Sequence, residues 1–267
     1  MFYRFVDDER RAVDLENIHS GSCILVGGAP DLENPDQWKM LQQLGITTMA
    51  MNNVATNFKP TYWVGADKSD NYSKSIIHDP SYLHFGYLSR CTSVSDGKPW
   101  KDYRNTIFLG SSEHIKASEF FDPLKHFVWW RNVFLLAIQV LYHLGFKKIY
   151  LLGCSFNISS EEQYSFETRL TAEQIDYNKN TYNMVLGQLK DIMPYFERHN
   201  FELISCTEES KLNNVIDYMK FEDVIKIMKD EIPKHDSINV DHPLLEKRRK
   251  KDESKIENND DYIIKVF

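Results

Sequence analysis

The sequence lacks an apolar run of the roughly 20 residues that a membrane-spanning helix needs. Its most apolar stretch, residues 128–145, is interrupted by polar residues, among them Arg131, Asn132 and His143. The opening segment MFYRFVDDERRAVD is too charged to be the apolar part of a secretory signal peptide. These absences predict a cytoplasmic protein without a transmembrane segment.

An excess of basic charge and closely paired cysteines are also missing. The 267 residues carry a net charge of −7, whereas nucleic-acid-binding proteins are normally basic, so we expect no nucleic-acid partner. The 4 cysteines are widely spaced, form no CxxC pair, and in two cases lie within apolar runs. This pattern favours buried thiols over disulfides or a zinc site, and we predict no metal.

Short apolar runs alternate with segments of helical periodicity along most of the chain. We predict strands at about residues 23–26, 47–51, 62–66, 107–109, 148–152 and 201–204, and helices at about 35–44, 132–144 and 171–198. This alternation is typical of an α/β fold with a mostly parallel sheet and helices on both faces. The predicted domain covers residues 1–228, and a charged C-terminal extension without periodicity covers residues 229–267.

The extension contains a block of basic residues, 247–251, and ends in the apolar segment YIIKVF at residues 262–267. A basic run of this length is most often a solvated tail, and the alternative is contact with an anionic partner or a membrane surface. The apolar end is suited to docking as an edge strand or against a second subunit of a homo-oligomer.

The most informative motif is CILVGGAP at residues 23–30. An apolar run ends in Gly27 and Gly28, which allow a sharp turn and a close approach of a ligand because they have no Cβ atom. Asp31 stands where a helix would begin, and the free N–H groups of a helix N-terminus favour anions. The motif matches neither the dinucleotide fingerprint nor the P-loop, so a nucleotide site and a tight turn without a ligand both stay open.

Polar residues follow the predicted strands at the points where parallel sheets bind ligands, beyond the carboxyl ends of the strands. These candidate binding residues are Gly27, Gly28, Asn52, Asn53, Asp67, Ser155 and Asn157, together with Ser205. Each of them alone could cap a loop, but their shared position predicts a common site.

Four segments together resemble one family: CILVGGAPDL (23–32), MAMNNV (49–54), KPTYWVGADKSD (59–70) and RNVFLLAIQVLYHLGFKKIYLLGCSF (131–156). They are similar to the bacterial sialyltransferases of glycosyltransferase family 42 and to the related motility-accessory-factor proteins, grouped as domain of unknown function 115. The resemblance implies a Rossmann-like domain with a lid at about residues 155–178. It also implies metal-independent transfer of a sugar from a nucleotide-activated donor, such as CMP-sialic acid, to a glycan or other hydroxyl acceptor.

The resemblance implies roles for individual residues as well. Asp67 would contact the donor, and Arg131 would pair with its anionic group, since a guanidinium pairs well with planar oxyanions. The two lid positions that bind the leaving phosphate in the family hold Phe156 and Tyr164 here. The nucleotide itself would be held by residues after the first two strands: Gly27, Gly28, Asn52 and Asn53.

Two departures from the family pattern concern the chemistry. Asp31 stands where the family has serine, and its negative charge would repel a phosphate. The family's general base is a histidine just before the helix that follows the lid, and residues 175–181 contain none. Asp176, Tyr177 and His126 remain as candidate bases, although a tyrosine hydroxyl is a poor base at neutral pH.

Two other functions are compatible with the same residues. A Mg²⁺-dependent diphosphokinase, as in a related pterin family, would need carboxylates for the metal, and Asp67 and Asp70 lie close together after a predicted strand. A nucleotide-binding protein that kept the scaffold and lost catalysis would account for the missing histidine and for Asp31. The donor sugar and the acceptor also stay open.

Overall fold

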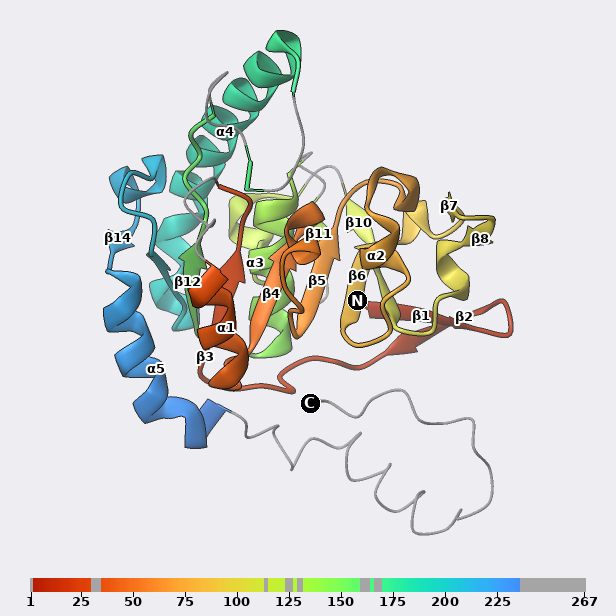
Figure 1. Cartoon of the computed structure of the whole chain (residues 1–267), viewed down its shortest axis with the longest axis horizontal. Coiled ribbons are helices and arrows are strands. Elements are labelled where there is room, and N and C mark those ends of the chain that lie inside the picture. The colour runs from red at the N-terminus through yellow and green to blue at the C-terminus, as the bar shows by residue number, and fades with distance from the viewer. Residues whose placement is uncertain are drawn as a thin grey trace.

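The computed structural model describes residues 2–29, 35–112, 115–122, 127–128, 132–158, 164–165 and 170–235. Its centre is a mostly parallel, 10-stranded sheet with helices packed against it (Figure 1). From one edge to the other the strands are β14 (Asp217–Tyr218), β13 (Glu202–Ser205), β12 (Lys148–Leu152), β3 (Ser22–Val26), β4 (Thr48–Met51), β5 (Tyr62–Gly65), β6 (Leu83–Tyr87), β9 (Thr106–Leu109), β1 (Phe2–Val6) and β2 (Glu9–Val13). The predicted α/β class with a mostly parallel sheet is confirmed.

Neighbouring strands are parallel from β14 through β9, and β1 pairs antiparallel with both β9 and β2. Every residue of β3, β4, β5 and β9 is buried, as expected for parallel strands that are covered on both faces. Two short ladders lie outside the sheet: β7 (Val94–Ser95) with β8 (Lys98–Pro99), and β10 (Ser111–Ser112) with β11 (Phe127–Val128).

Helices cover both faces of the sheet, as predicted. On one face α3 (Val133–Leu144) and α4 (Ala172–Ile192) pack against the sheet, and Leu136 and Leu189 share an apolar cluster with Leu25. On the other face lie α1 (Pro35–Gln43), α2 (Lys74–Ile77) and α5 (Phe221–His235). Burial of a large apolar side chain stabilises a fold by roughly 1.5–3 kcal/mol, so these two layers hold the strand ends in place.

Helix α3 begins and ends where its sequence indicates. Oδ1 of Asn132 accepts a hydrogen bond of 2.6 Å from the N–H of Phe134, which is an N-cap interaction. Gly145 ends the helix in the left-handed conformation with φ 110°. A Cβ atom at Gly145 would lie 2.1 Å from the carbonyl oxygen of His19, so only glycine fits between the helix and this loop.

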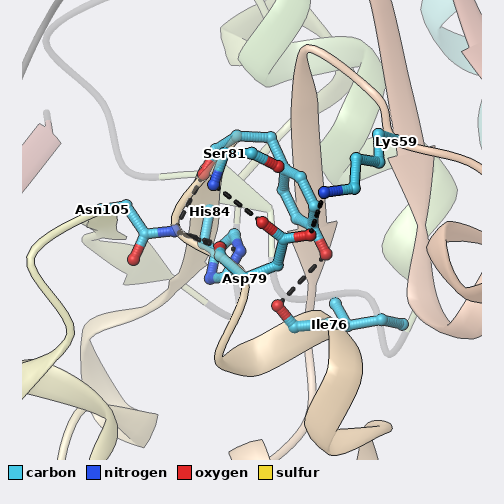
Figure 2. A network of polar contacts seen from close by, with 7 residues as sticks. Lys59, Ile76, Asp79, Ser81, His84 and Asn105 are labelled. Carbon is cyan, nitrogen blue, oxygen red and sulfur yellow. Dashed lines mark hydrogen bonds and ion pairs between the residues drawn. The ribbon is translucent and has the colours of Figure 1, made fainter.

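Strand β6 is not predicted by the sequence, because a histidine and a glycine interrupt its apolar pattern. Its first half is held by a polar network at the amino ends of the strands (Figure 2). Nδ2 of Asn105 donates to the carbonyl groups of Asp79 (2.9 Å) and Tyr82 (2.8 Å), and Nζ of Lys59 lies 3.2 Å from the Asp79 carboxylate. His84 is fully buried within the same network. Long-range contacts, rather than the local sequence pattern, therefore determine this strand.

The hairpin of β1 and β2 is also unpredicted. Asp7 and Asp8 have φ angles of 51° and 63° and occupy its two-residue turn, which matches the geometry of a type I′ turn. Phe2 is buried, but β2 is exposed over residues 9–12 and carries charged side chains, which suit an unpaired sheet edge.

The carboxyl-terminal part differs from the prediction in three ways. Helix α4 ends at Ile192 instead of near residue 198, because Pro194 has no N–H to continue the helix, and 3₁₀ turns follow. Strand β13 is followed by the edge strand β14. Helix α5 buries Val224 and Met228 and continues to His235, so this helix extends across the predicted boundary at residue 228.

Several predictions lie outside the described residues: those on Asp31, on the basic block 247–251 and on the apolar end 262–267. Across the described ranges, no helix is long and apolar enough to cross a membrane.

Candidate functional site

The strand order reverses direction beside β3. The chain runs from β3 through β4, β5, β6 and β9 toward one edge, then crosses back to β12 and continues through β13 to β14 at the other edge. The loops after β3 and β12 therefore leave their strands toward opposite sides. In open parallel sheets such a reversal opens a crevice at the carboxyl ends of the strands, where ligands bind.

The glycine turn lies at this crevice. The N–H of Gly27 donates to the carbonyl oxygen of Leu152 (2.8 Å), and the N–H of Ala29 donates to that of Gly153 (2.9 Å). A Cβ atom at Gly27 would lie 2.4 Å from the oxygen of Gly153 and 2.8 Å from Sγ of Cys154. Residue 27 must be glycine because the two strand ends meet here without room for a side chain.

A cavity of about 680 Å³ extends from this turn along the carboxyl ends of β3, β4, β5, β6 and β12. The first residues of α3 and one face of α4 complete its wall. Most of the residues predicted from the sequence line it: Gly27, Gly28, Asn52, Asn53, Asp67, Ser155, Asn157, Tyr164 and Tyr177. The topology therefore brings together side chains that are far apart in the sequence.

Asn52 turns into the cavity immediately after β4. Its backbone has φ 52°, in the left-handed region that asparagine tolerates better than most residues. Its carbonyl oxygen accepts a hydrogen bond of 2.7 Å from Nε1 of Trp63, which fixes the turn. Among the described residues, Oδ1 of Asn52 is buried and has no hydrogen-bond partner. Since a buried polar atom without a partner is costly, this amide is available for a ligand. The neighbouring Asn53 instead holds the loop, accepting a bond of 3.1 Å from the N–H of Ser73.

Asp67 follows β5 and is exposed within the cavity wall. Its N–H donates to the hydroxyl of Tyr72 at 2.8 Å. The Tyr72 ring lies directly on Gly65, where a Cβ atom would be 2.7 Å from the hydroxyl oxygen. Burial, and secondarily the charge of Asp67, raises the pKa of Tyr72 and of Tyr87, which ends β6. Both hydroxyls are therefore protonated at neutral pH.

The described part of the predicted lid lies across the glycine turn. The N–H of Ser165 donates to the carbonyl oxygen of Gly28 (3.0 Å), and Nδ2 of Asn57 donates to the carbonyl oxygen of Ser165 (3.2 Å). These two bonds connect the lid with the loops after β3 and β4. Tyr164 is thereby held over the cavity.

Two tyrosine hydroxyls form a pair beneath this lid segment. The hydroxyl oxygens of Tyr164 and Tyr182 are 3.2 Å apart, and Nδ2 of Asn178 lies 3.4 Å from that of Tyr164. Burial raises the pKa of both tyrosines, so the pair stays neutral; one hydroxyl donates to the other, and the second can donate to an anion.

Phe156 supports the same region from the loop after β12. It has φ 55°, which is rare for an aromatic residue, and its ring packs against Phe134 (4.9 Å between centroids) and Tyr182 (5.0 Å). Strained backbone of this kind concentrates at ligand sites because the surrounding packing must maintain it.

Positive charge at the cavity has two sources. The N-terminus of α3, with Asn132, Val133 and Phe134, lines the cavity, and a helix N-terminus carries roughly half a positive charge. Arg90, just beyond β6, adds a guanidinium group to the wall. Asp67 is the carboxylate among the described lining residues. The cavity thus combines neutral donors with a cationic component, which suits an anionic ligand.

Some predicted residues are not part of this cavity. Asp176 does not line it: its side chain is 76% exposed and lies 3.9 Å from Nζ of Lys179. The reason is helical phase, since Tyr177, Asn178 and Thr181 occupy the inward face of α4 and position 176 points elsewhere. Ser205 is buried, and its hydroxyl donates to the carbonyl oxygen of Thr207 (3.4 Å).

The metal-binding pair considered for a diphosphokinase does not form either. Asp67 lines the cavity, whereas Asp70 lies in the 3₁₀ turn Ser69–Asn71 and does not. Within the described ranges no group of three or more histidine, cysteine or acidic residues could hold a metal ion. His126 and Arg131, a candidate base and a candidate anion partner, lie outside the described residues.

The cavity contains residues that the sequence analysis did not identify: Tyr72, Tyr87, Arg90, Asn178 and Tyr182. Tyr87 and Arg90 were missed because β6 is not apparent from the sequence. Asn178 and Tyr182 are four residues apart and therefore share one face of α4, next to the face that holds Tyr177 and Thr181.

Cys23, Cys154 and Cys206 are buried, as predicted for thiols in apolar runs, whereas Cys91 is half-buried. The chain matches no model of a known protein family, and no curated protein matches it.

Proposed function

We propose that this chain is a glycosyltransferase with a Rossmann-like fold that transfers a sugar from a nucleotide-activated donor, most simply a CMP-sugar such as CMP-sialic acid, to a hydroxyl acceptor without a metal ion. One observation carries the proposal: the described residues that resemble the donor site of family 42 sialyltransferases converge on a single cavity at the strand reversal. Residues chosen only because they follow strands would not all have to meet there.

In this proposal the nucleotide binds at the crevice between β3 and β12. Gly27 lets the ends of β3 and β12 meet beside the phosphate position, and the N-terminus of α3 provides a favourable potential for the phosphate. The unpartnered Oδ1 of Asn52 accepts a hydrogen bond from the base or the ribose. These groups act on the unreacted donor and mainly determine its affinity.

The leaving group is stabilised by the tyrosine pair. As the bond between the anomeric carbon and the phosphate oxygen breaks, negative charge grows on the phosphate. The neutral hydroxyls of Tyr164 and Tyr182 are already fixed, and fixed donors facing a developing charge lower the barrier by several kcal/mol in comparable sites, about 2.7–4 kcal/mol per donor in one case. Tyr182 also supplies a hydroxyl next to Phe156, where the family pattern has a tyrosine.

The direct test uses the full chain with a panel of CMP- and UDP-sugars. Isothermal titration calorimetry measures binding, and release of CMP or UDP measures donor turnover. We expect binding of CMP-sugars and slow release of CMP even without an acceptor. Binding without release would favour the non-catalytic nucleotide-binding protein, and absence of both across the panel would refute the proposal.

A variant of Asn52 tests the assignment of the cavity. Asn52→Asp places a negative charge beside the anionic donor, and we expect at least about a tenfold loss of CMP affinity, or roughly 1.4 kcal/mol. Asn200→Asp is a matched control, because Asn200 has the same left-handed backbone (φ 47°) and does not line the cavity. Equal CMP affinity in the two variants would contradict a nucleotide site at Asn52.

A further inference from the structure

We propose that Asp67 is the general base of this site: its carboxylate takes the proton from the attacking hydroxyl of the acceptor. The inference rests on the proposed function, and it assigns to Asp67 a role in the transfer step instead of a role in donor binding. The resemblance does not provide a base, because the family's histidine is absent here.

The residues that line the cavity determine which group can accept the proton. Transfer to a hydroxyl needs a proton acceptor that is unprotonated near neutral pH, most often a histidine or a carboxylate. No histidine lines the cavity among the described residues, and Asp67 is the carboxylate that does. Asp70 and Asp176 lie outside it, and Asp176 is highly exposed beside Lys179.

The neighbouring tyrosine hydroxyls cannot act as the general base. Burial raises the pKa of Tyr72, Tyr87, Tyr164 and Tyr182, so all four remain protonated at neutral pH. They can donate hydrogen bonds to a phosphate or a sugar, but they cannot accept the proton. Asp67 is exposed to the cavity, which leaves its carboxylate accessible to an acceptor.

Asp67 lies two strands away from the glycine turn, because it follows β5 and the turn follows β3. The strand order β3-β4-β5 separates the two strand ends by two inter-strand spacings of about 4.8 Å, or roughly 10 Å in total. Inversion at a sugar carbon needs the leaving group and the base on opposite sides of that carbon.

The backbone of Asp67 is held by a hydrogen bond to Tyr72. Its N–H donates to the hydroxyl of Tyr72 (2.8 Å), whose ring is fixed against Gly65, so the backbone that carries the carboxylate is anchored to the sheet. Tyr72 is therefore a positioning residue. The charge of Asp67 acts on the hydroxyls of both Tyr72 and Tyr87, which places the carboxylate on the side of the cavity that contains these groups.

The step is balanced in atoms and charge. The acceptor O–H bond breaks and its proton passes to the Asp67 carboxylate. A bond forms between the acceptor oxygen and the anomeric carbon. The bond from that carbon to the phosphate oxygen breaks, and its electron pair leaves with the nucleoside monophosphate.

The experiment measures CMP release from CMP-sialic acid by the full chain, with water as the acceptor. For Asp67→Asn we expect kcat to fall by about 100-fold or more, within the range of general-base catalysis, while KM for the donor stays within about threefold. Asp70→Asn is the matched control and should behave like the parent chain. If the two carboxylates held a metal ion together, Asp70→Asn would lose activity as Asp67→Asn does.

Each outcome decides between the proposals. If the parent chain neither binds nor cleaves the donor, the proposed function fails and the base assignment fails with it. If the parent is active and Asp67→Asn keeps more than about a tenth of kcat, or mainly raises KM, the base assignment alone is overturned. If Asp67→Asn does not fold, Asp67→Ala replaces it: a drop in kcat with unchanged KM supports the assignment, and an unchanged kcat overturns it.

Discussion

Acidification should destabilise this fold through a buried histidine that is remote from the candidate site. His84 is fully buried in β6, with its ring centroid 5.3 Å from that of Trp63 and 4.9 Å from that of Tyr82. Nε2 lies 3.3 Å from Nδ2 of Asn105, a group that already donates to two carbonyl oxygens (Figure 2). A second proton on the ring would be buried, and this burial outweighs the opposing charge of Asp79 and lowers the pKa of His84 to about 3.

The size of the effect follows from the difference between the two states. An unfolded histidine has a pKa near 6.5, so the unfolded chain binds the proton first as the pH falls. The contribution of His84 to stability is complete above about pH 6.5 and is lost as the pH falls toward about 3, the folded pKa. At about pH 5 the difference is roughly 1.5 pH units, or about 2 kcal/mol at 1.36 kcal/mol per unit. This is a substantial part of the roughly 5–15 kcal/mol that stabilises a typical domain.

The substitution His84→Phe isolates this contribution. Phenylalanine keeps the aromatic packing on Trp63, and Asn105 keeps its two carbonyl partners. Urea unfolding at about pH 7.5 and about pH 5.0, followed by circular dichroism, should show a pH-dependent loss of stability about 2 kcal/mol smaller in the variant than in the parent. His78→Phe replaces an exposed histidine and controls for the substitution. An identical pH dependence in parent and His84→Phe would refute the reasoning.

Two further substitutions test the site. Gly27→Ala should lower both the melting temperature and the CMP affinity, because its Cβ atom would lie 2.4 Å from the oxygen of Gly153. Gly187→Ala is the control, because a Cβ atom there meets nothing within 4 Å, and it should stabilise α4 by up to about 1 kcal/mol. Equal stability of the two variants in thermal unfolding would contradict this account of the crevice. Tyr182→Phe should lower kcat for CMP release by roughly 10- to 100-fold with donor KM little changed, whereas the exposed Tyr218→Phe should leave it unaltered. Loss of donor binding in Tyr182→Phe would instead show that the hydroxyl binds the unreacted donor and does not act mainly on the transition state.

Much of the central fold was predictable from local sequence. The apolar runs of β3 and β12 are buried on both faces and are therefore continuous in the sequence. Helix α3 has a capping asparagine at its start and a glycine at its end, so its limits are encoded within a few residues. Polar residues after strands could also be identified, because the carboxyl ends of parallel strands share one edge.

Other elements depend on contacts between distant residues. Strand β6 contains His84 and Gly86, neither typical of a buried strand, yet pairing with β5 and β9 makes it a central strand. A Cβ atom at Gly86 would lie 2.4 Å from the Trp100 ring, so the glycine is required by a residue that is remote in sequence. Without β6, neither Tyr87 nor Arg90 could be assigned to the cavity.

The sequence by itself determined the α/β alternation, the glycine turn and the polar residues that directly follow β3, β4, β5 and β12, because each of these depends on a short local pattern. Only the tertiary structure decided which carboxylate faces the cavity. Asp67 and Asp176 are equivalent candidates by composition, but the end of β5 turns one into the cavity and the phase of α4 directs the other to solvent. Strand order and helical phase are properties of the packed molecule, and they select the groups available for chemistry.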